Sequence, residues 1–229
     1  DAQESRGLGD VYKRQECTTN IINRLLKHSD GNVYAFCNRS VFKCSMNQTV
    51  ETVFPDIAIP SPTYSVAQAP DKDIYIGTES NGLYIYSENW KLKKHVPIDG
   101  IIATILPDNN GDIWLGLDET GICLFNKNKQ TFTWLHKDNT NLNNNSIRTF
   151  VSYGDSSILV GTFRGLNILN KKELTITPAN INIAGKGGLS HYSIHSMLID
   201  KDQTLWIGTY SAGVNYHSPV SYTHLRAHE

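Results

Sequence analysis

The chain has 229 residues, of which 39% are hydrophobic and 19% charged, and its formal net charge is −1. This composition is typical of an ordinary folded protein and excludes a disordered polyelectrolyte. The 21 Lys and Arg residues nearly balance the 22 Asp and Glu residues, and no basic run occurs, so nucleic-acid binding by this chain is not expected. No apolar stretch approaches the roughly 18 residues of a spanning helix, so membrane contact is expected only through regions outside this sequence.

The four cysteines are too few and too scattered for a disulfide framework or a zinc site. Cys37 and Cys44 flank an expected hairpin turn. A pairing between them stays open beside a role as small buried hydrophobic residues. We expect neither a metal nor a cofactor.

The two ends of the chain differ from the rest. Residues 1–15 and 220–229 resemble translated sequencing-adapter scars at the edges of metagenomic gene fragments. We predict that both are non-native tails that take no part in the fold. The natural protein is then expected to continue in both directions, so the lack of a signal peptide carries no information.

Between the tails, a short apolar run that ends in glycine recurs along the chain. These glycines are Gly77, Gly116, Gly161 and Gly208, and a second glycine follows at Gly82, Gly121, Gly165 and Gly213. The first set is separated by 39, 45 and 47 residues, a period typical of blade-type repeats. A similar segment ends at Phe36, 41 residues before Gly77. We therefore count five repeats, of which the first is divergent.

Within each repeat, β-branched and aromatic runs are separated by short polar turns, which indicates antiparallel strands joined by hairpins. No segment shows the 3.6-residue period of a helix. The third repeat predicts strands over Ile101 to Leu106, Asp112 to Leu117, Gly121 to Asn126, and Thr131 to Leu135. Four such strands make one propeller blade.

The sequence therefore predicts an all-β chain, a partial β-propeller of about five four-stranded antiparallel blades. The blades are expected within residues 16–219, at approximately 20–55, 62–98, 99–136, 145–180 and 190–218. The second strand is apolar on both faces, which suits a strand between neighbouring blades, so we assign Trp114 and Trp206 to blade packing. The glycine that ends this strand suits a close backbone approach or a bulge.

The repeats resemble the two-component-regulator propeller repeat. The segments that carry the resemblance are Asn109 to Gly116 with Gly121, and Asp200 to Gly213. The resemblance implies a periplasmic sensor region of a hybrid two-component histidine kinase, for which glycan breakdown products are the usual inferred signals. It also implies an oligosaccharide ligand and a homodimer formed through the parent protein. Phe36, in place of glycine, departs from this pattern.

The loops between the second and third strands are the candidate ligand site. They are Glu79-Ser80-Asn81, Asp118-Glu119-Thr120, Phe163-Arg164 and Tyr210-Ser211-Ala212. Equivalent loops of a propeller share one face, so we expect a rim of polar and aromatic side chains, the composition that carbohydrate recognition uses. Ordinary solvated loops would have a similar composition, and this alternative stays open.

Two other functions are weighed against a sensor. One is a scaffold or dimerisation module without a ligand site of its own. The other, less favoured, is a polysaccharide-active enzyme, which would need two carboxylates about 5–10 Å apart from among Glu79, Asp118 and Glu119. No catalytic motif is present, and we assign no catalytic residue. His191 and His195 would lie about 13 Å apart on a strand, too far to share one metal ion.

Overall fold

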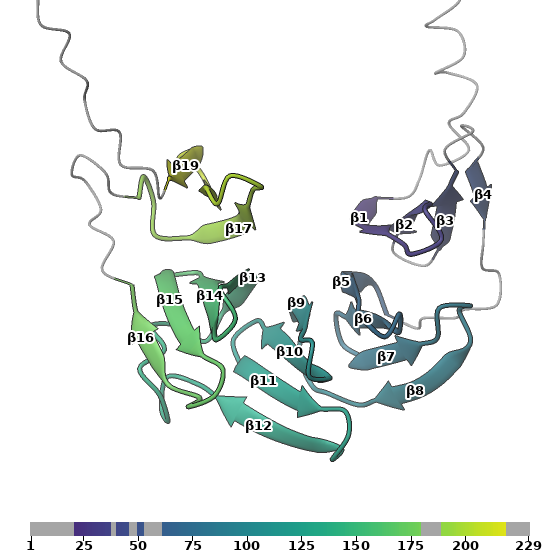
Figure 1. The fold of residues 1–229 in the computed structure, drawn as a ribbon, viewed down its shortest axis with the longest axis horizontal. Helices are drawn as coiled ribbons and strands as arrows, with labels where there is room; N and C mark the ends of the chain where they lie inside the picture. Colours follow the sequence, from purple (N-terminus) through teal and green to yellow (C-terminus); the bar gives the residue numbers. More distant parts are fainter. Residues whose placement is uncertain (1–20, 38–39, 46–49, 53–60, 180–188, 219–229) are drawn as a thin grey trace, which may run out of the picture. The chain divides into compact units, whose positions relative to one another are not determined.

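The computed structural model describes residues 21–37, 40–45, 50–52, 61–179 and 189–218, and in these ranges it contains strands and no helix (Figure 1). Accordingly, the described ranges hold no helix long and apolar enough to cross a membrane. The predicted tails, 1–15 and 220–229, lie outside the described residues. The chain divides into two compact units, residues 1–63 and residues 64–229.

Five antiparallel sheets follow one another along the chain, and each is built from consecutive strands. The first compact unit holds β1 (Ile22–Lys27), β2 (Val33–Cys37), β3 (Val41–Cys44) and β4 (Val50–Thr52). The second sheet has β5 (Thr63–Gln68), which begins at the boundary, with β6 (Ile74–Thr78), β7 (Leu83–Tyr86) and β8 (Leu92–Val96). The third sheet has β9 (Ile102–Pro107), β10 (Asp112–Leu117), β11 (Gly121–Asn126) and β12 (Thr131–Leu135). The fourth sheet has β13 (Ile147–Tyr153), β14 (Ser157–Thr162), β15 (Gly165–Asn170) and β16 (Ile176–Pro178). The fifth sheet has β17 (Ile194–Ile199), β18 (Leu205–Thr209) and β19 (Val214–His217).

These sheets are the blades of a β-propeller, so the predicted fold class is confirmed. In the third blade the predicted strands match the observed ones, apart from a shift of one residue at β9. The fifth blade has three strands among the described residues. Within the second compact unit, β5, β9 and β13 run along the inner side of the sheets, and β8, β12 and β16 run along the outer side (Figure 1).

Apolar side chains fill the space between successive blades of the second compact unit. Strand β10 packs against both neighbouring blades, because alternate side chains of a strand point to opposite faces. Ile113 and Leu115 pack with Tyr75 and Leu83 of the second blade. Trp114, in contrast, packs in the cluster that holds Ile147 and Phe150 of the fourth blade. The burial of both faces of this strand is why its sequence is apolar throughout.

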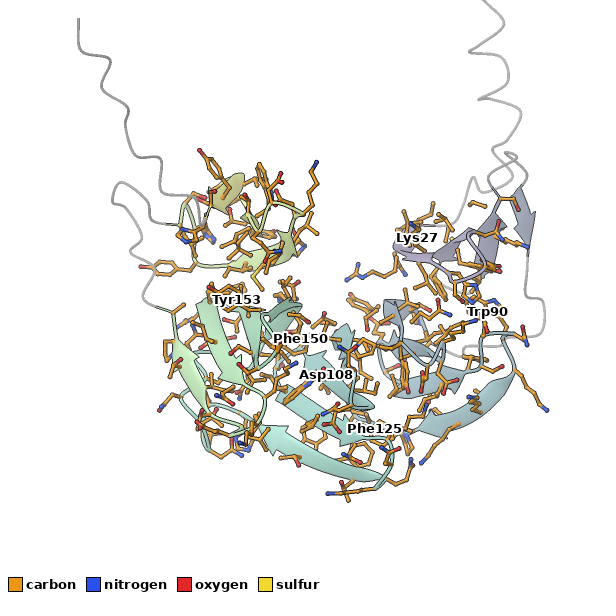
Figure 2. The ribbon with its side chains drawn as sticks, viewed as in Figure 1. Lys27, Trp90, Asp108, Phe125, Phe150 and Tyr153 are labelled. Carbon is orange, nitrogen blue, oxygen red and sulfur yellow. The ribbon has the colours of Figure 1, made fainter. Side chains whose placement is uncertain are left out.

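In the second, third and fourth blades, the glycine near the end of the second strand receives a side chain from the following blade. A Cβ atom on Gly116 would lie 2.5 Å from Cγ2 of Ile147 and 3.0 Å from Cζ of Phe150, a residue labelled in Figure 2. Gly77 has the same relation to Ile102, and Gly161 to Ile194, at 2.6 Å from Cγ2 in both cases. The absence of a side chain at these positions therefore lets adjacent blades approach closely.

The face of the fifth blade that carries Trp206 is exposed over the described residues. Trp114 is 1% exposed, whereas Trp206 is 40% exposed, and Leu198 and Tyr216 beside it are also exposed. The Trp206 indole donates a hydrogen bond of 2.7 Å to Asp200 Oδ2 and lies tilted against the Tyr216 ring. Assigning Trp206 to blade packing therefore differs from what is observed, because no described blade covers this face.

Cys37 and Cys44 do not face each other. The second hairpin of the first blade closes between Cys37 and Ser40, where the Cys37 amide donates to the Ser40 carbonyl. Cys44 consequently lies opposite Val33, at the far end of the strand pair. The two residues therefore lie at opposite ends of the strand pair and do not form a disulfide with each other, so the pairing left open on sequence grounds is wrong.

Gly116→Ala tests the packing of adjacent blades. The new Cβ would overlap Ile147 of the fourth blade, and overpacking of this kind costs about 1–3 kcal/mol. We expect urea unfolding to show a loss of this size in the free energy of unfolding.

Gly208→Ala is the matched control, because its Cβ would meet only the rotatable Ser196 hydroxyl closer than 3.8 Å. We expect a smaller loss, below about 1 kcal/mol. Equal losses in the two variants would show that the glycine is not needed for contact between blades.

Candidate functional site

The loops of the second compact unit lie at two opposite ends of its sheets. Because consecutive strands are antiparallel, the loops between second and third strands share one end with the connections from one blade to the next. We call this end the 2–3 loop face. The turns between first and second strands and between third and fourth strands lie at the other end, which we call the 1–2 loop face.

Charged side chains on the 1–2 loop face join neighbouring blades. Lys127, in the turn after β11, places its Nζ 2.5 Å from Asp71 Oδ2 and 2.6 Å from Asp73 Oδ2, both in the second blade. Lys171, in the turn after β15, repeats the arrangement at 3.1 Å from Oδ2 of Asp108 in the third blade, a residue labelled in Figure 2. These ion pairs give the charges on this face a structural role.

The contacts of the Lys127 cluster shift the pKa values of Asp71 and Lys127. Burial acts to raise the pKa of Asp71, but the hydrogen bonds from Lys127 and from the Asp73 amide outweigh it and hold the pKa below its ordinary value. Burial acts to lower the pKa of Lys127, but hydrogen bonds to Asp71 and Asp73 outweigh it and raise the pKa above its ordinary value. Each partner therefore stabilises the charged form of the other.

The candidate loops on the 2–3 loop face share one backbone geometry. In three blades, the second residue after the repeat glycine donates a hydrogen bond from its backbone amide. The acceptor is the carbonyl oxygen of the residue just before the inner strand. Asp118 N donates to Ile101 O, Phe163 N to Ser146 O and Tyr210 N to Ser193 O, each at 3.0 Å. The side chains of Asp118, Phe163 and Tyr210 therefore occupy equivalent positions, and Glu79 has the same position in the repeat of the second blade.

The remaining candidate loop residues are mostly in solvent. Glu79, Ser80, Glu119, Arg164 and Ser211 are exposed. Glu119 has a left-handed backbone, with φ of 65°. Within the described part of the chain, no ion pair joins Glu79, Glu119 or Arg164 to another of the predicted rim residues.

Asn81 is held inside its own blade. Its amide donates to Thr78 Oγ1 at 3.0 Å, and its side chain donates to the Tyr84 hydroxyl at 2.6 Å. Its carbonyl also lies 2.6 Å from Nε2 of His95. These contacts give Asn81 a local structural role in shaping the loop.

Asp118 joins two blades on this face. Its Oδ2 lies 3.4 Å from Nη1 of Arg148, which is on β13 of the fourth blade. Its Oδ1 is buried and has no hydrogen-bond partner among the described residues. Buried polar atoms nearly always have a partner, so this oxygen is available to a donor from outside the described part of the chain.

Aromatic side chains lie on the same face. Phe163 is 49% exposed and Tyr210 is 72% exposed. Tyr210 makes an edge-on contact with His195 of β17, with ring centroids 6.2 Å apart. Exposed rings beside a carboxylate and a guanidinium can offer both an apolar surface and directional hydrogen bonds to a ligand.

The sequence prediction missed Arg148 and gave His195 no binding role. Both lie on inner strands, whereas the prediction considered only loops for ligand contact. A signal was nevertheless present, because residues thirteen before each repeat reference position differ strongly in chemistry. They are Asn23, Tyr64, Ala103, Arg148 and His195.

The histidines form no metal site in the described part of the chain. His191 lies before β17, where its Nδ1 accepts a hydrogen bond of 3.0 Å from the Ser193 amide. Among the described residues, no group of three or more His, Cys, Asp or Glu side chains could hold a metal ion. Of the three loop acids considered for catalysis, Asp118 is paired with Arg148, and Glu79 and Glu119 are exposed.

Residues 188–211 match the family model described as a two component regulator propeller. This match, in the fifth repeat, confirms the resemblance inferred from the sequence. No curated protein matches the chain.

Several solved structures share the fold. The extracellular domain of a protein named as a hybrid two component system from B. thetaiotaomicron is 24% identical with a TM-score of 0.67, over 85% of this chain and 26% of that one. The extracellular domain of a protein named as a one component system from the same organism is 19% identical with a TM-score of 0.70, over 86% of this chain and 27% of that one. Virginiamycin B lyase from Staphylococcus aureus is 14% identical with a TM-score of 0.61, over 86% of this chain and 69% of that one. The chain thus spans about a quarter of the length of the two Bacteroides domains.

Lys127→Met tests the ion pairs between blades. The substitution keeps most of the aliphatic stem but leaves Asp71 and Asp73 without this partner. We expect the free energy of unfolding to fall by about 1–2 kcal/mol, the range for hydrogen bonds to partly exposed charged groups. Lys129→Met, at an exposed position in the same turn, is the control and should change stability by less than about 0.5 kcal/mol.

The ion pair between Lys127 and Asp71 predicts that stability depends on pH. The pKa of Asp71 in the folded chain lies below the ordinary value of 3.8, so its contribution is complete above that value and is lost as the pH falls through the folded pKa. Denaturant unfolding from about pH 6 to about pH 3 should therefore show the difference between wild type and Lys127→Met shrinking. A difference that stays constant over this range would show that the carboxylates do not carry the stabilisation.

Proposed function

We propose that this chain is part of the periplasmic sensor region of a hybrid two-component regulator, and that it contributes to sensing glycan breakdown products. The observation that carries the proposal is the match of residues 188–211 to the two component regulator propeller. The similarity of the fold to extracellular domains named as parts of bacterial signalling systems supports it.

The chemistry of the 2–3 loop face also favours ligand binding. It combines exposed aromatic rings at Phe163 and Tyr210 with the Asp118–Arg148 pair, which has one unsatisfied carboxylate oxygen. In contrast, ion pairs between blades occupy Lys127 and Lys171 on the 1–2 loop face. An oligosaccharide suits the first face, because sugars present hydroxyl groups and an apolar ring face together.

Signalling would follow from a change in how blades or neighbouring domains pack. A ligand that binds one arrangement better than another shifts the equilibrium between them, and a bias of a few kcal/mol is sufficient. In the parent protein, such a shift would move a membrane-spanning segment that leads to a histidine kinase, through a homodimer of sensor regions.

Calorimetry on the parent protein, with this region intact, tests the proposal. We expect saturable binding of at least one oligosaccharide from a broad glycan panel, and we expect the same glycan to activate the regulator in a reporter assay. Flat titrations across the panel, in a protein that still signals, would overturn direct sensing by these blades.

A scaffold or dimerisation module remains the second candidate. The exposed apolar side chains of the fifth blade, which include Leu198, Trp206 and Tyr216, favour it. A scaffold would keep signalling when the aromatic residues of the 2–3 loop face are replaced, whereas a sensor would lose its response to the glycan.

A further inference from the structure

The inner strands of the blades carry an extra residue at the same point. Pairing with the second strand shifts register between Ile22 and Arg24 in the first blade, between Ile147 and Thr149 in the fourth and between Ile194 and Ser196 in the fifth. In the third blade, Gly116 lies opposite Thr104 and Leu117 opposite Ile102, so Ala103 is the extra residue. A β-bulge of this kind bends the strand and changes the direction of a side chain.

Packing restricts the residues on both sides of the bulge. The residue before the bulge is an isoleucine in the first, third, fourth and fifth blades. In the third, fourth and fifth blades, this isoleucine packs over the glycine of the preceding blade. The residue after it is Ser or Thr in the last four blades. The bulged residue itself varies from Ala103 to Arg148 to His195, so blade packing does not determine its chemistry.

Two of these bulged residues reach the 2–3 loop face. Arg148 contacts Asp118 of the preceding blade, and His195 contacts Tyr210 of its own blade. The isoleucines immediately before them, Ile147 and Ile194, are fully buried, whereas His195 is exposed and Arg148 is partly exposed. The bulge therefore turns these side chains out of the packing layer and toward the candidate loops.

We propose that Asp118, Arg148, Phe163, His195 and Tyr210 form a binding site for a neutral, hydroxyl-rich ligand of the glycan class. The proposal rests on the proposed sensor function and names its binding residues. Phe163 belongs to the same face as the two contacting pairs, because it holds in the fourth blade the loop position that Asp118 and Tyr210 hold in the third and fifth.

The unsatisfied Asp118 oxygen points to a ligand that donates hydrogen bonds. Oδ1 is buried without a partner, and leaving such an atom unsatisfied costs free energy that a ligand hydroxyl would recover. Arg148 already neutralises the carboxylate, so the pair has no net charge. An acidic sugar would bring a second carboxylate beside Asp118, and these five residues include no second Lys or Arg to offset it. The site therefore favours a neutral sugar.

The aromatic side chains supply the apolar part of the site. The exposed faces of Phe163 and Tyr210 suit the C–H face of a sugar ring. His195 is exposed and can donate or accept a hydrogen bond through its ring nitrogens. The site therefore combines a stacking surface with hydrogen-bond donors and acceptors, as sugar recognition requires.

Calorimetry on the full chain tests this site with neutral trisaccharides (cellotriose, xylotriose, mannotriose, arabinotriose and maltotriose) and with digalacturonate as the acidic probe. We expect at least one neutral trisaccharide to bind the wild type. We expect His195→Ala and Tyr210→Ala each to weaken that binding about tenfold or more, with unchanged melting temperatures because both side chains are exposed.

Asp118→Asn and Arg148→Ala should weaken binding as well, and the two exposed variants keep the test valid if either of these fails to fold. Lys172→Ala and Asp155→Asn are the controls, because both residues are exposed on turns of the 1–2 loop face. They should bind as the wild type does.

The outcomes separate this site from the sensor function. If a neutral trisaccharide binds and the His195 and Tyr210 variants keep wild-type affinity, this site is wrong and the sensor function stands. Binding of digalacturonate alone would overturn the neutral ligand. If no probe binds the wild type, both the site and direct glycan sensing by this chain are overturned.

Discussion

The contact between an isoleucine of one blade and a glycine of the preceding blade is the constraint on which the array depends. Cγ2 of Ile147 lies only 2.5 Å from the place that a Cβ of Gly116 would take, and Ile102 and Ile194 have the same relation to Gly77 and Gly161. The contact sets how closely adjacent sheets approach. It also explains why a residue that weakens a strand on its own occurs at the same point of the second, third and fourth repeats.

This contact also leaves one position of the inner strands, the bulged residue, free to vary in chemistry. The isoleucine points toward the preceding blade, and the Ser or Thr two residues later lies over the glycine of its own blade. An ordinary strand places residues two apart on the same face and in continuous pairing, so the bulge is what separates their roles. The residue between them carries neither contact, and at this position Arg148 and His195 are turned outward. Packing and recognition are thus assigned to adjacent residues of one strand.

The sequence was sufficient for the strands and insufficient for the contacts between blades. Strand period and turn residues are local, so β10, β11 and β12 could be predicted to the residue. Trp114 and Trp206 have the same local pattern, yet only Trp114 has a covering blade among the described residues. The Asp118–Arg148 pair joins residues 30 positions apart on different blades, and the bulge that brings them together leaves no turn signal in the sequence.

The lysine–aspartate pairs of the 1–2 loop face have an evolutionary consequence. In both pairs, a blade contributes a lysine from its third turn to the aspartate of its predecessor, as Lys127 does for Asp71 and Lys171 for Asp108. The third blade supplies Lys127 to the ion pair with the second blade and Asp108 to the ion pair with the fourth blade. Duplication of such a blade would yield a copy that already fits its neighbours electrostatically. New blades could then be acquired by recombination, while single substitutions at the bulge diversify what the opposite face recognises.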